Sequence, residues 1–449
     1  MISYGPRFLT KWMLLIILIG VVIRLVLGFL LTYNYDVYHW ALTISNFEAG
    51  NGLYDTAGYY YTPVWGYFLG VFTQFTELFG LDSLGDRFAE LLFTEDDVCI
   101  TPHTAFVTSL GFNIGITVLI TIFDILTAFM VHWIVREVFK DDRKAMICAA
   151  IWMLCPLVIV VGAIGGMFDV MSAFLLLLCV ALLMKEQELL AGMILSTAVM
   201  LKFFPGFLVF LLIAYIIVKH RDDWKPRMAK AVLGAGVMLA IIMVPQVMDG
   251  TIMDSLSFMT ARASSEGEGI SLDSIMMMLS YVAILVGEVI LALLYVKVKH
   301  DDDDRAFIGY LLFGSLIIFI FPSAPQYLLM LAPFLVIHAC CSDRRIWVPL
   351  ILLMVFTSLF DLSSLPMEMT SVLMYTDWLP MDAWMPIYDA FASKMFGITT
   401  FDAIDELCFI MQSVAVIIAI AMIAYRVLLE GTEEGRFIRE RLPRSPKGA

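Results

Sequence analysis

The chain has 449 residues, of which 61% are hydrophobic and only 16% are charged. Its formal net charge of −14 argues against nucleic acid or another anionic soluble ligand as a partner. Apolar runs long enough to cross a bilayer recur along the whole length, so the sequence predicts one all-α, polytopic membrane domain over residues 1–449 and no separate soluble domain.

The first apolar run, from Trp12 to Leu31, follows Arg7 and Lys11, and no small-residue cleavage site comes after it. This pattern predicts a retained first span rather than a signal peptide. Hydropathy predicts about twelve transmembrane helices in all. The predicted spans are roughly 12–32, 106–135, 146–163, 168–184, 189–203, 205–218, 231–248, 275–296, 306–321, 326–341, 347–362 and 407–428.

Lys and Arg residues concentrate in alternate loops, and 23 of the 28 fall on one side of the predicted membrane. The positive-inside rule makes this side cytoplasmic, and both termini lie on it, including the tail at 429–449. The same count requires that the apolar stretch Val64–Phe79 does not cross the bilayer. We therefore expect an integral protein of the cell membrane or an ER-type membrane, with its site on the extracytoplasmic side.

The first external loop, residues 33–105, is too long for a simple connection. It contains two amphipathic segments, Val37–Phe47 and Val64–Phe79, which we expect to lie in the plane of the membrane interface. The alternatives are short helices that pack on the bundle and, for Val64–Phe79, a true span. In the same loop Asp36 stands just outside the first span, and an aromatic sequence follows it, which suggests chemistry at the bilayer surface.

Three later turns are predicted to meet on this external surface, because the odd-numbered spans end there. They contain Asp169 after a glycine pair, Lys202 before a proline, and the pair Gln326-Tyr327. Each has a simpler interpretation: Asp169 could cap a helix, Lys202 could reach the lipid head groups, and Gln326-Tyr327 could be an interfacial anchor.

A second external loop, residues 363–405, interleaves tryptophan and tyrosine with aspartate. Aromatic faces stack on sugars and carboxylates accept hydrogen bonds from sugar hydroxyls, so Trp378 in this loop is a candidate for binding an acceptor. The alternative is an aromatic belt at the membrane interface.

Two charged residues, Arg24 and Asp124, lie inside predicted spans, where an unpaired charge is costly. We expect them to form a structural ion pair between the first two helices. The six histidines are scattered and the seven cysteines have no ligand spacing, so neither a metal nor a nucleotide cofactor is implied, and no disulfide framework is expected.

Several short motifs follow one another in a recognisable order. They are Asp36 with Tyr54, Tyr59-Tyr60-Tyr61-Thr62-Pro63, Glu77-Leu78-Phe79-Gly80, Asp124-Ile125-Leu126-Thr127-Ala128-Phe129, Asp169, Lys202-Phe203-Phe204-Pro205 and Gln326-Tyr327-Leu328. In this order and spacing they resemble the GT-C glycosyltransferases that use polyprenyl-phosphate sugars, in particular the family that adds the first mannose to the GPI-anchor precursor. The likeness runs from the first span to about Pro333.

The resemblance implies a GT-C-like fold and a hexosyltransferase that moves a sugar, expected to be mannose, from dolichyl phosphate mannose to a lipid-linked or glycan acceptor with inversion. Asp36 would be the general base, and Lys202 and Arg262 would stabilise the leaving lipid phosphate. The expected substrate-binding residues are Asp169, Tyr54, Tyr61, Gln326, Tyr327 and Trp378. The lipid-phosphate sugar is a co-substrate and no cofactor is expected; the further expected partners are membrane lipid and a small membrane subunit, not nucleic acid.

A secondary transporter is the main alternative, because it would also have about twelve spans. Transporters typically contain internal repeats, and the later half of the chain has no second copy of the pattern from Asp36 to Pro63. A scaffold or flippase-like partner protein is a third interpretation, but it leaves the external cluster of polar residues unexplained.

Overall fold

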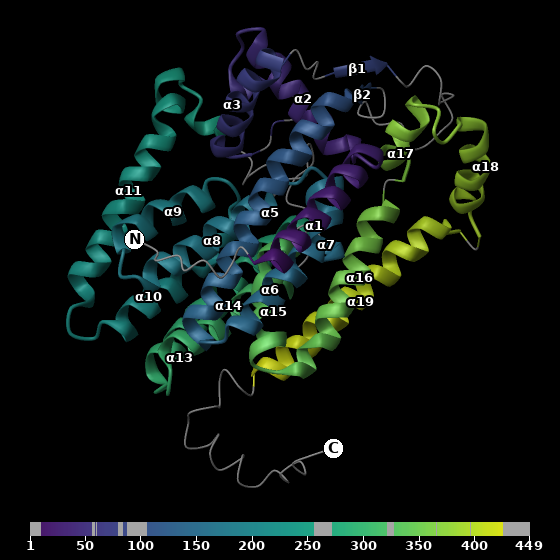
Figure 1. The fold of residues 1–449 in the computed structure, drawn as a ribbon. Coiled ribbons are helices and arrows are strands. Elements are labelled where there is room, and N and C mark those ends of the chain that lie inside the picture. The colour runs from purple at the N-terminus through teal and green to yellow at the C-terminus, as the bar shows by residue number, and fades with distance from the viewer. Residues whose placement is uncertain are drawn as a thin grey trace, which may run out of the picture.

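The computed structural model describes residues 10–55, 59, 61–79, 84–87, 106–255, 272–320, 327–364, 366–395 and 397–424. These residues form a bundle of helices with a group of shorter elements at one end (Figure 1). The predicted helical, polytopic fold is confirmed. In the described part of the chain the strands are a short antiparallel pair, β1 (Leu84–Arg87) and β2 (Phe106–Thr108), which the sequence analysis did not predict.

The helices α1 (Lys11–Leu30) and α5 (Leu110–Phe139) begin at hydroxyl caps: the Thr10 side chain accepts a hydrogen bond from the Met13 amide, and the Ser109 side chain accepts one from the Phe112 amide. With 30 residues, α5 runs through the interior of the bundle. It packs against α1, α6 (Asp142–Leu154) and α8 (Asp169–Met184), so it forms the support on which the later site elements are placed.

A proline divides the next predicted span. Pro156 cannot continue α6 and instead opens the short helix α7 (Pro156–Val158), which leads into the π-helical segment η3 (Ile159–Ile164), with a bend of 45°. The turn that follows needs glycine at position 166, because its φ is +63° and a Cβ there would lie 2.6 Å from the Val37 side chain. This turn brings the start of α8 to the end of the bundle.

Each of the twelve predicted spans overlaps a helix among the described residues, although the span predicted from residue 106 begins in β2. The remaining bundle elements are α9 (Glu188–Val199), η4 (Phe204–Leu208), α10 (Val209–Lys219), α11 (Trp224–Asp249), α13 (Leu272–Lys297), α14 (Asp303–Ile320), α15 (Leu328–Cys341), η6 (Arg344–Ile346), α16 (Trp347–Ser364) and α19 (Thr400–Ala424). The estimate of twelve crossings is too high for the described residues: six helices are long and apolar enough to cross a membrane, or seven if the bent pair counts as one span. Helices such as α9, with 12 residues, are too short to span by themselves.

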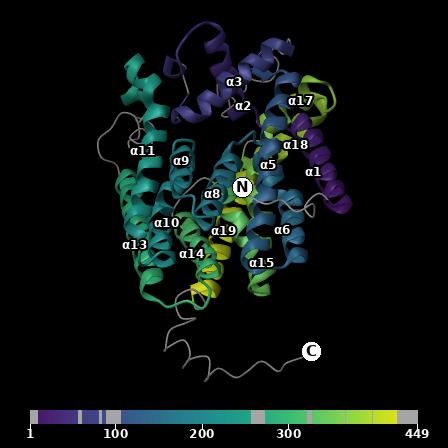
Figure 2. The same cartoon turned by 60° about the vertical axis from the view of Figure 1, so that its left-hand side comes forward.

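The long first loop contains two helices, as expected, α2 (Asn34–Glu48) and α3 (Pro63–Phe79). They pack on each other at one end of the bundle, beside the β-strands, α17 (Pro366–Tyr375) and α18 (Met381–Ala392) (Figure 2). We call this group of elements, which includes η1 (Leu53–Asp55), the cap. The helix α3 has 17 residues and is not among the helices long and apolar enough to cross a membrane. This agrees with the expectation that Val64–Phe79 does not cross the bilayer. Which face of the membrane the cap occupies stays a prediction.

Candidate functional site

Aromatic rings from the cap and from the start of α8 form a cluster where the cap meets the bundle. The rings of Trp65 and Phe168 are stacked, with centroids 4.6 Å apart and an angle of 15° between their planes. Trp40 packs against both of them, at 5.4 Å and 5.7 Å, and its indole nitrogen donates a hydrogen bond of 3.2 Å to the carbonyl of Gly166. The glycine turn therefore joins α2 to α8 and fixes the position of Phe168.

The ammonium group of Lys202 lies beside this cluster. It is 3.2 Å from Asp169 Oδ2, and both side chains are almost fully buried, at 6% and 4% exposure. Three ring faces surround the same nitrogen, those of Phe168 at 4.6 Å, Tyr61 at 5.1 Å and Tyr327 at 5.1 Å. Lys202 is thus turned into the protein rather than toward lipid head groups, because the break between α9 and η4 points it inward.

The tyrosine-rich loop before α3 contacts Lys202 through Tyr61, and hydrogen bonds from hydroxyl groups of the loop hold it in place. Tyr59 donates a hydrogen bond to the Thr62 carbonyl at 2.9 Å and accepts one from the Gly66 amide at 2.7 Å. Tyr54 donates to the Tyr61 carbonyl at 3.2 Å, and Thr62 donates to the Met200 carbonyl. Burial raises the pKa of the Tyr54 and Tyr59 hydroxyls well above their ordinary value of 10.0, so both stay neutral hydrogen-bonding groups.

A small pocket opens against Lys202. The residues that line it are Tyr61, Thr62, Leu201, Lys202, Phe203, Phe204 and Tyr327. Phe204 and Tyr327 are in contact, with ring centroids 4.1 Å apart, so they close one side of this pocket. Within the described residues the Lys202 nitrogen lacks a hydrogen-bond acceptor, and its contact with Asp169 is an ion pair without hydrogen-bond geometry.

Asp36, the predicted base, lies on α2 with 8% of its surface exposed. Its charge acts on Asp361, near the end of α16, together with the charges of Asp169 and Asp405. Asp361 and the rings of Trp40, Trp65 and Phe168 belong to this region but were not singled out from the sequence. An acid at the end of an apolar span is the signal that could have indicated Asp361.

Three other residues that were predicted to bind substrate are not among the described residues at the Lys202 site. Arg262 and Gln326 lie outside the described residues. Trp378 is 66% exposed and packs edge-on against Phe29 at 6.3 Å, and no described contact links it to Lys202. Its role in acceptor binding stays a prediction.

Arg24 and Asp124 form the expected ion pair, deep in the bundle and away from the Lys202 site. The Arg24 Nε atom donates to Asp124 Oδ2 at 2.7 Å, and neither side chain is exposed. Arg24 Nη1 also donates to the carbonyls of Gly20 and Met153, while the Trp152 indole donates to the Asp124 carbonyl. These bonds tie α1 to α5 and α6. As for metals, no group of three or more His, Cys, Asp or Glu side chains in the described part of the chain could hold an ion.

Comparison with known proteins gives one family. The family model described as GPI transamidase subunit PIG-U matches residues 88–267. The match includes Asp169 and Lys202 and ends before Tyr327, so the chain is similar to this family over about two fifths of its length, 180 of 449 residues. No curated protein matches the chain.

This match overturns the predicted activity. The chain was expected to transfer a hexose from a polyprenyl phosphate, with a transporter as the alternative, but the matched family is described as a GPI transamidase subunit, which is neither. The resemblance to the mannosyltransferase is therefore unsupported as a reaction. The physical reason is that the motifs around Asp36, Tyr61 and Lys202 reflect the packing of a loop on a helical bundle. The same packing can occur in proteins with different activities, so it does not specify a reaction. A subunit description agrees with the expected membrane partner protein and with an integral membrane location.

Proposed function

We propose that this chain is a membrane subunit of a complex that attaches a glycolipid to protein, and that its part is to hold the head group of that lipid at the Lys202 site. The similarity to the GPI transamidase subunit supports the complex, and the matched residues include the ion pair between Asp169 and Lys202. A lipid-linked glycan has its chains in the bilayer and its sugars at the edge. A site at the end of an apolar bundle suits such a ligand.

The observation that carries this proposal is the state of the Lys202 ammonium. A lysine ammonium has three N–H donors, and in the described residues none of them has an acceptor in hydrogen-bond geometry, although the side chain is 6% exposed and lines a pocket. Leaving buried polar groups unsatisfied costs free energy. A ligand oxygen in the pocket would complete the coordination of this nitrogen.

The surroundings suit a glycan. Three carboxylates meet one described cation here, since the charges of Asp36 and Asp169 both act on Asp361, and Lys202 is paired with Asp169. Carboxylates accept hydrogen bonds from hydroxyl groups, and ring faces such as that of Tyr327 offer stacking surfaces. The site would therefore bind a hydroxyl-rich head group through many neutral contacts and one cationic contact.

Binding of a GPI glycolipid to the full chain in detergent, compared with phosphatidylinositol carrying the same chains, tests the proposal. A charge-assisted hydrogen bond contributes about 1.5–3 kcal/mol, so Lys202→Met should weaken glycolipid binding by roughly ten- to a hundredfold, with Lys202→Arg partly restoring it. Lys185→Met is the matched control, because Lys185 is an exposed lysine bonded to Glu137 at the other end of the bundle. Equal binding of the two lipids, or an unchanged affinity in Lys202→Met, would refute the proposed function.

A further inference from the structure

A second pocket lies between α8, α9, α10 and α11, in the half of the bundle far from the cap. It encloses about 90 Å³ and is open on one side, and all of its lining residues are apolar or glycine. Six of them, from the four helices, are Leu183, Leu195, Leu212, Ile216, Ala231 and Val232. The site described above does not use any part of this pocket.

Small residues keep this pocket open by letting α9 and α11 approach closely. A Cβ on Gly192 would lie 2.0 Å from the Ala231 carbonyl oxygen, and a Cβ on Gly234 would lie 2.0 Å from the Leu189 carbonyl oxygen. Ser196 also donates a hydrogen bond to the Ala235 carbonyl at 2.9 Å. Because the backbones of α9 and α11 touch at these glycines, no side chain lies between the two helices there. The pocket lies beside this contact and is not filled by a side chain.

Part of the pocket wall belongs to the exposed side of α11. Only 17% of the apolar window of this helix is buried, and Val232 at the pocket is 62% exposed. A helix with this exposure faces hydrocarbon when the protein is in a membrane. The pocket is therefore accessible from the hydrocarbon region.

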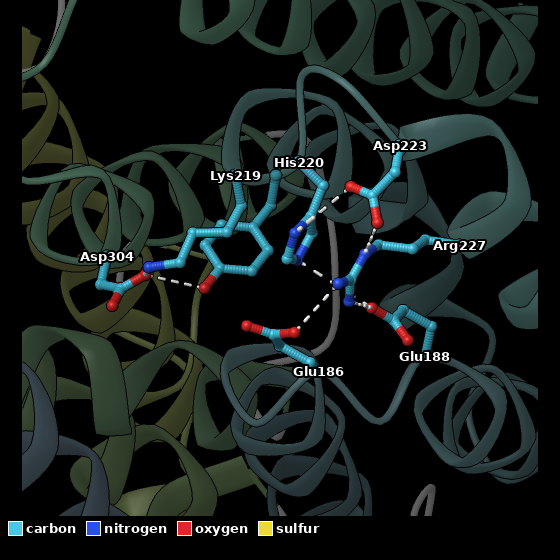
Figure 3. A network of polar contacts seen from close by, with 8 residues as sticks. Glu186, Glu188, Lys219, His220, Asp223, Arg227 and Asp304 are labelled. Atoms are coloured by element: carbon cyan, nitrogen blue, oxygen red, sulfur yellow. Dashed lines mark hydrogen bonds and ion pairs between the residues drawn. The ribbon is translucent and has the colours of Figure 1, made fainter.

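Charged side chains form a network at the turn between α10 and α11 (Figure 3). Arg227 bonds to Glu186 at 3.0 Å, to Glu188 at 2.5 Å and to Asp223 at 2.8 Å. The guanidinium group is thus occupied by protein carboxylates, and His220 lies 4.0 Å from Glu188 and 3.9 Å from Asp223. This network holds the turn in place. Because Arg227 is already bonded to three carboxylates, a ligand phosphate would bind a different cation.

Lys225 is the cation on the pocket face of α11. It precedes the pocket residues Met228 and Val232 by three and seven positions, a spacing that places all three on one side of a helix. Lys225 is exposed, is outside the described ion pairs, and lies over the ring of Trp224 at 5.8 Å. Lys230, two positions after Met228, falls on the opposite side of the helix.

We infer that this pocket holds a segment of one hydrocarbon chain of a membrane phospholipid, with the lipid phosphate at Lys225. The wall is apolar, Val232 in that wall is exposed, and Lys225 is an exposed cation on the same side of α11. A partner helix is a poor occupant, because one turn of a helix about 10 Å across fills roughly 400 Å³, several times the enclosed volume. This inference does not depend on the proposed function of the Lys202 site.

The first test fills the pocket from its mouth. Val232→Trp places a ring in the opening, whereas Leu233→Trp adds the same ring at a neighbouring position that is 60% exposed and does not line the pocket. Binding of phosphatidylcholine to the full chain in detergent is followed by native mass spectrometry, with thermal midpoints to verify folding. Loss of at least tenfold in affinity in Val232→Trp, with Leu233→Trp unchanged, supports the inference; equal affinities in the two variants would overturn it.

The second test concerns the phosphate. Phosphatidylglycerol carries a net negative charge on its phosphate, diacylglycerol with the same chains lacks the phosphate, and a lysine near an anionic lipid surface contributes roughly a fivefold effect on binding. Phosphatidylglycerol should therefore bind about fivefold more tightly than diacylglycerol, and Lys225→Gln should remove this preference while Lys230→Gln keeps it. A preference that persists in Lys225→Gln, or its absence in the unmodified chain, would overturn the assignment of the phosphate to Lys225.

Discussion

Two buried ion pairs in the described part of the chain are built in different ways. The pair of Arg24 and Asp124 is at 2.7 Å with neither side chain exposed, and the pair of Lys202 and Asp169 is at 3.2 Å with slight exposure. Arg24 also bonds to two backbone carbonyls from different helices. Lys202 instead has ring faces around it and a pocket beside it.

The difference separates a structural pair from a pair suited to binding. A guanidinium group has five donors in a fixed plane, and three contacts with three helices use it to join them. An ammonium group is compact and rotatable, and ring faces attract it without taking up its N–H donors. In the first pair Arg24 makes three hydrogen bonds within the bundle and leaves only Nη2 without an acceptor, whereas in the second pair the Lys202 ammonium has no hydrogen-bond acceptor among the described residues.

The largest expected effect comes from breaking the structural pair. Asp124→Leu leaves Arg24 charged and buried, so the stability should fall by about 3–5 kcal/mol. The double variant Arg24→Met, Asp124→Leu removes both charges and should recover most of that loss. Thermal and denaturant unfolding in detergent would measure both, and a single variant as stable as the unmodified chain would contradict a structural role.

A smaller loss is expected where two helices touch without any charge. Gly192→Ala places a Cβ against the Ala231 carbonyl, which cannot rotate away, so about 1–3 kcal/mol of stability should be lost. Gly236→Ala on α11 is the matched control, because nothing lies within 4 Å of its Cβ position. Similar unfolding midpoints for the two variants would show that the α9 and α11 contact adapts.

The rings around Lys202 provide a direct test of the difference between the two pairs. In a double-mutant cycle, Tyr327→Leu and Lys202→Met should be coupled by about 0.5–2 kcal/mol, because the ring and the ammonium interact at 5.1 Å. Tyr327→Phe keeps a ring and should keep most of the coupling. The same cycle with Arg24→Met in place of Lys202→Met should give no coupling, and coupling there would mean that the two sites are not independent.

The smallest effect is expected at the exposed network of Figure 3. The hydrogen bond from Arg227 lowers the pKa of Asp223 below its ordinary value of 3.8. A lowered pKa stabilises the folded state above pH 3.8, and this contribution is lost as the pH falls through the lower value of the folded protein. When the stability is measured from neutral to acidic pH, Asp223→Asn and Arg227→Gln should both remove the loss that comes from protonation of Asp223. An unchanged pH dependence would mean that the contact between Asp223 and Arg227 is not maintained in solution.

Much of the architecture followed from sequence patterns. Apolar runs predicted where helices occur, and the long loop before α5 was expected to hold two helices, found here as α2 and α3. The pairing of Arg24 with Asp124 was also predicted, because two opposite charges in apolar helices have few other stable arrangements. The number of full crossings was overestimated, because hydropathy measures composition and not whether a helix is long enough or is bent at Pro156.

The site shows where sequence patterns stop being sufficient. Asp36, Asp169, Lys202 and Tyr327 were expected on one surface from the parity of the spans. The same parity puts Asp361 on that surface, at the end of the eleventh predicted span, but it does not show that Asp361 lies close to Asp36 and Asp169. The activity inferred from the motifs was wrong, since the family that matches residues 88–267 is described as a GPI transamidase subunit. Motifs constrain local backbone and packing, while a reaction depends on distances between side chains.

The sequence by itself determined that this is a helical membrane protein with a polar cluster beyond its first span, because hydrophobicity and charge act locally and along the chain. Only the tertiary structure decided that Lys202 turns inward to Asp169 under three rings. It also decided that α9 and α11 touch through Gly192 and enclose an apolar pocket. Both outcomes depend on contacts between helices distant in the chain, and the energies of those contacts are set by shapes that a one-dimensional pattern does not contain.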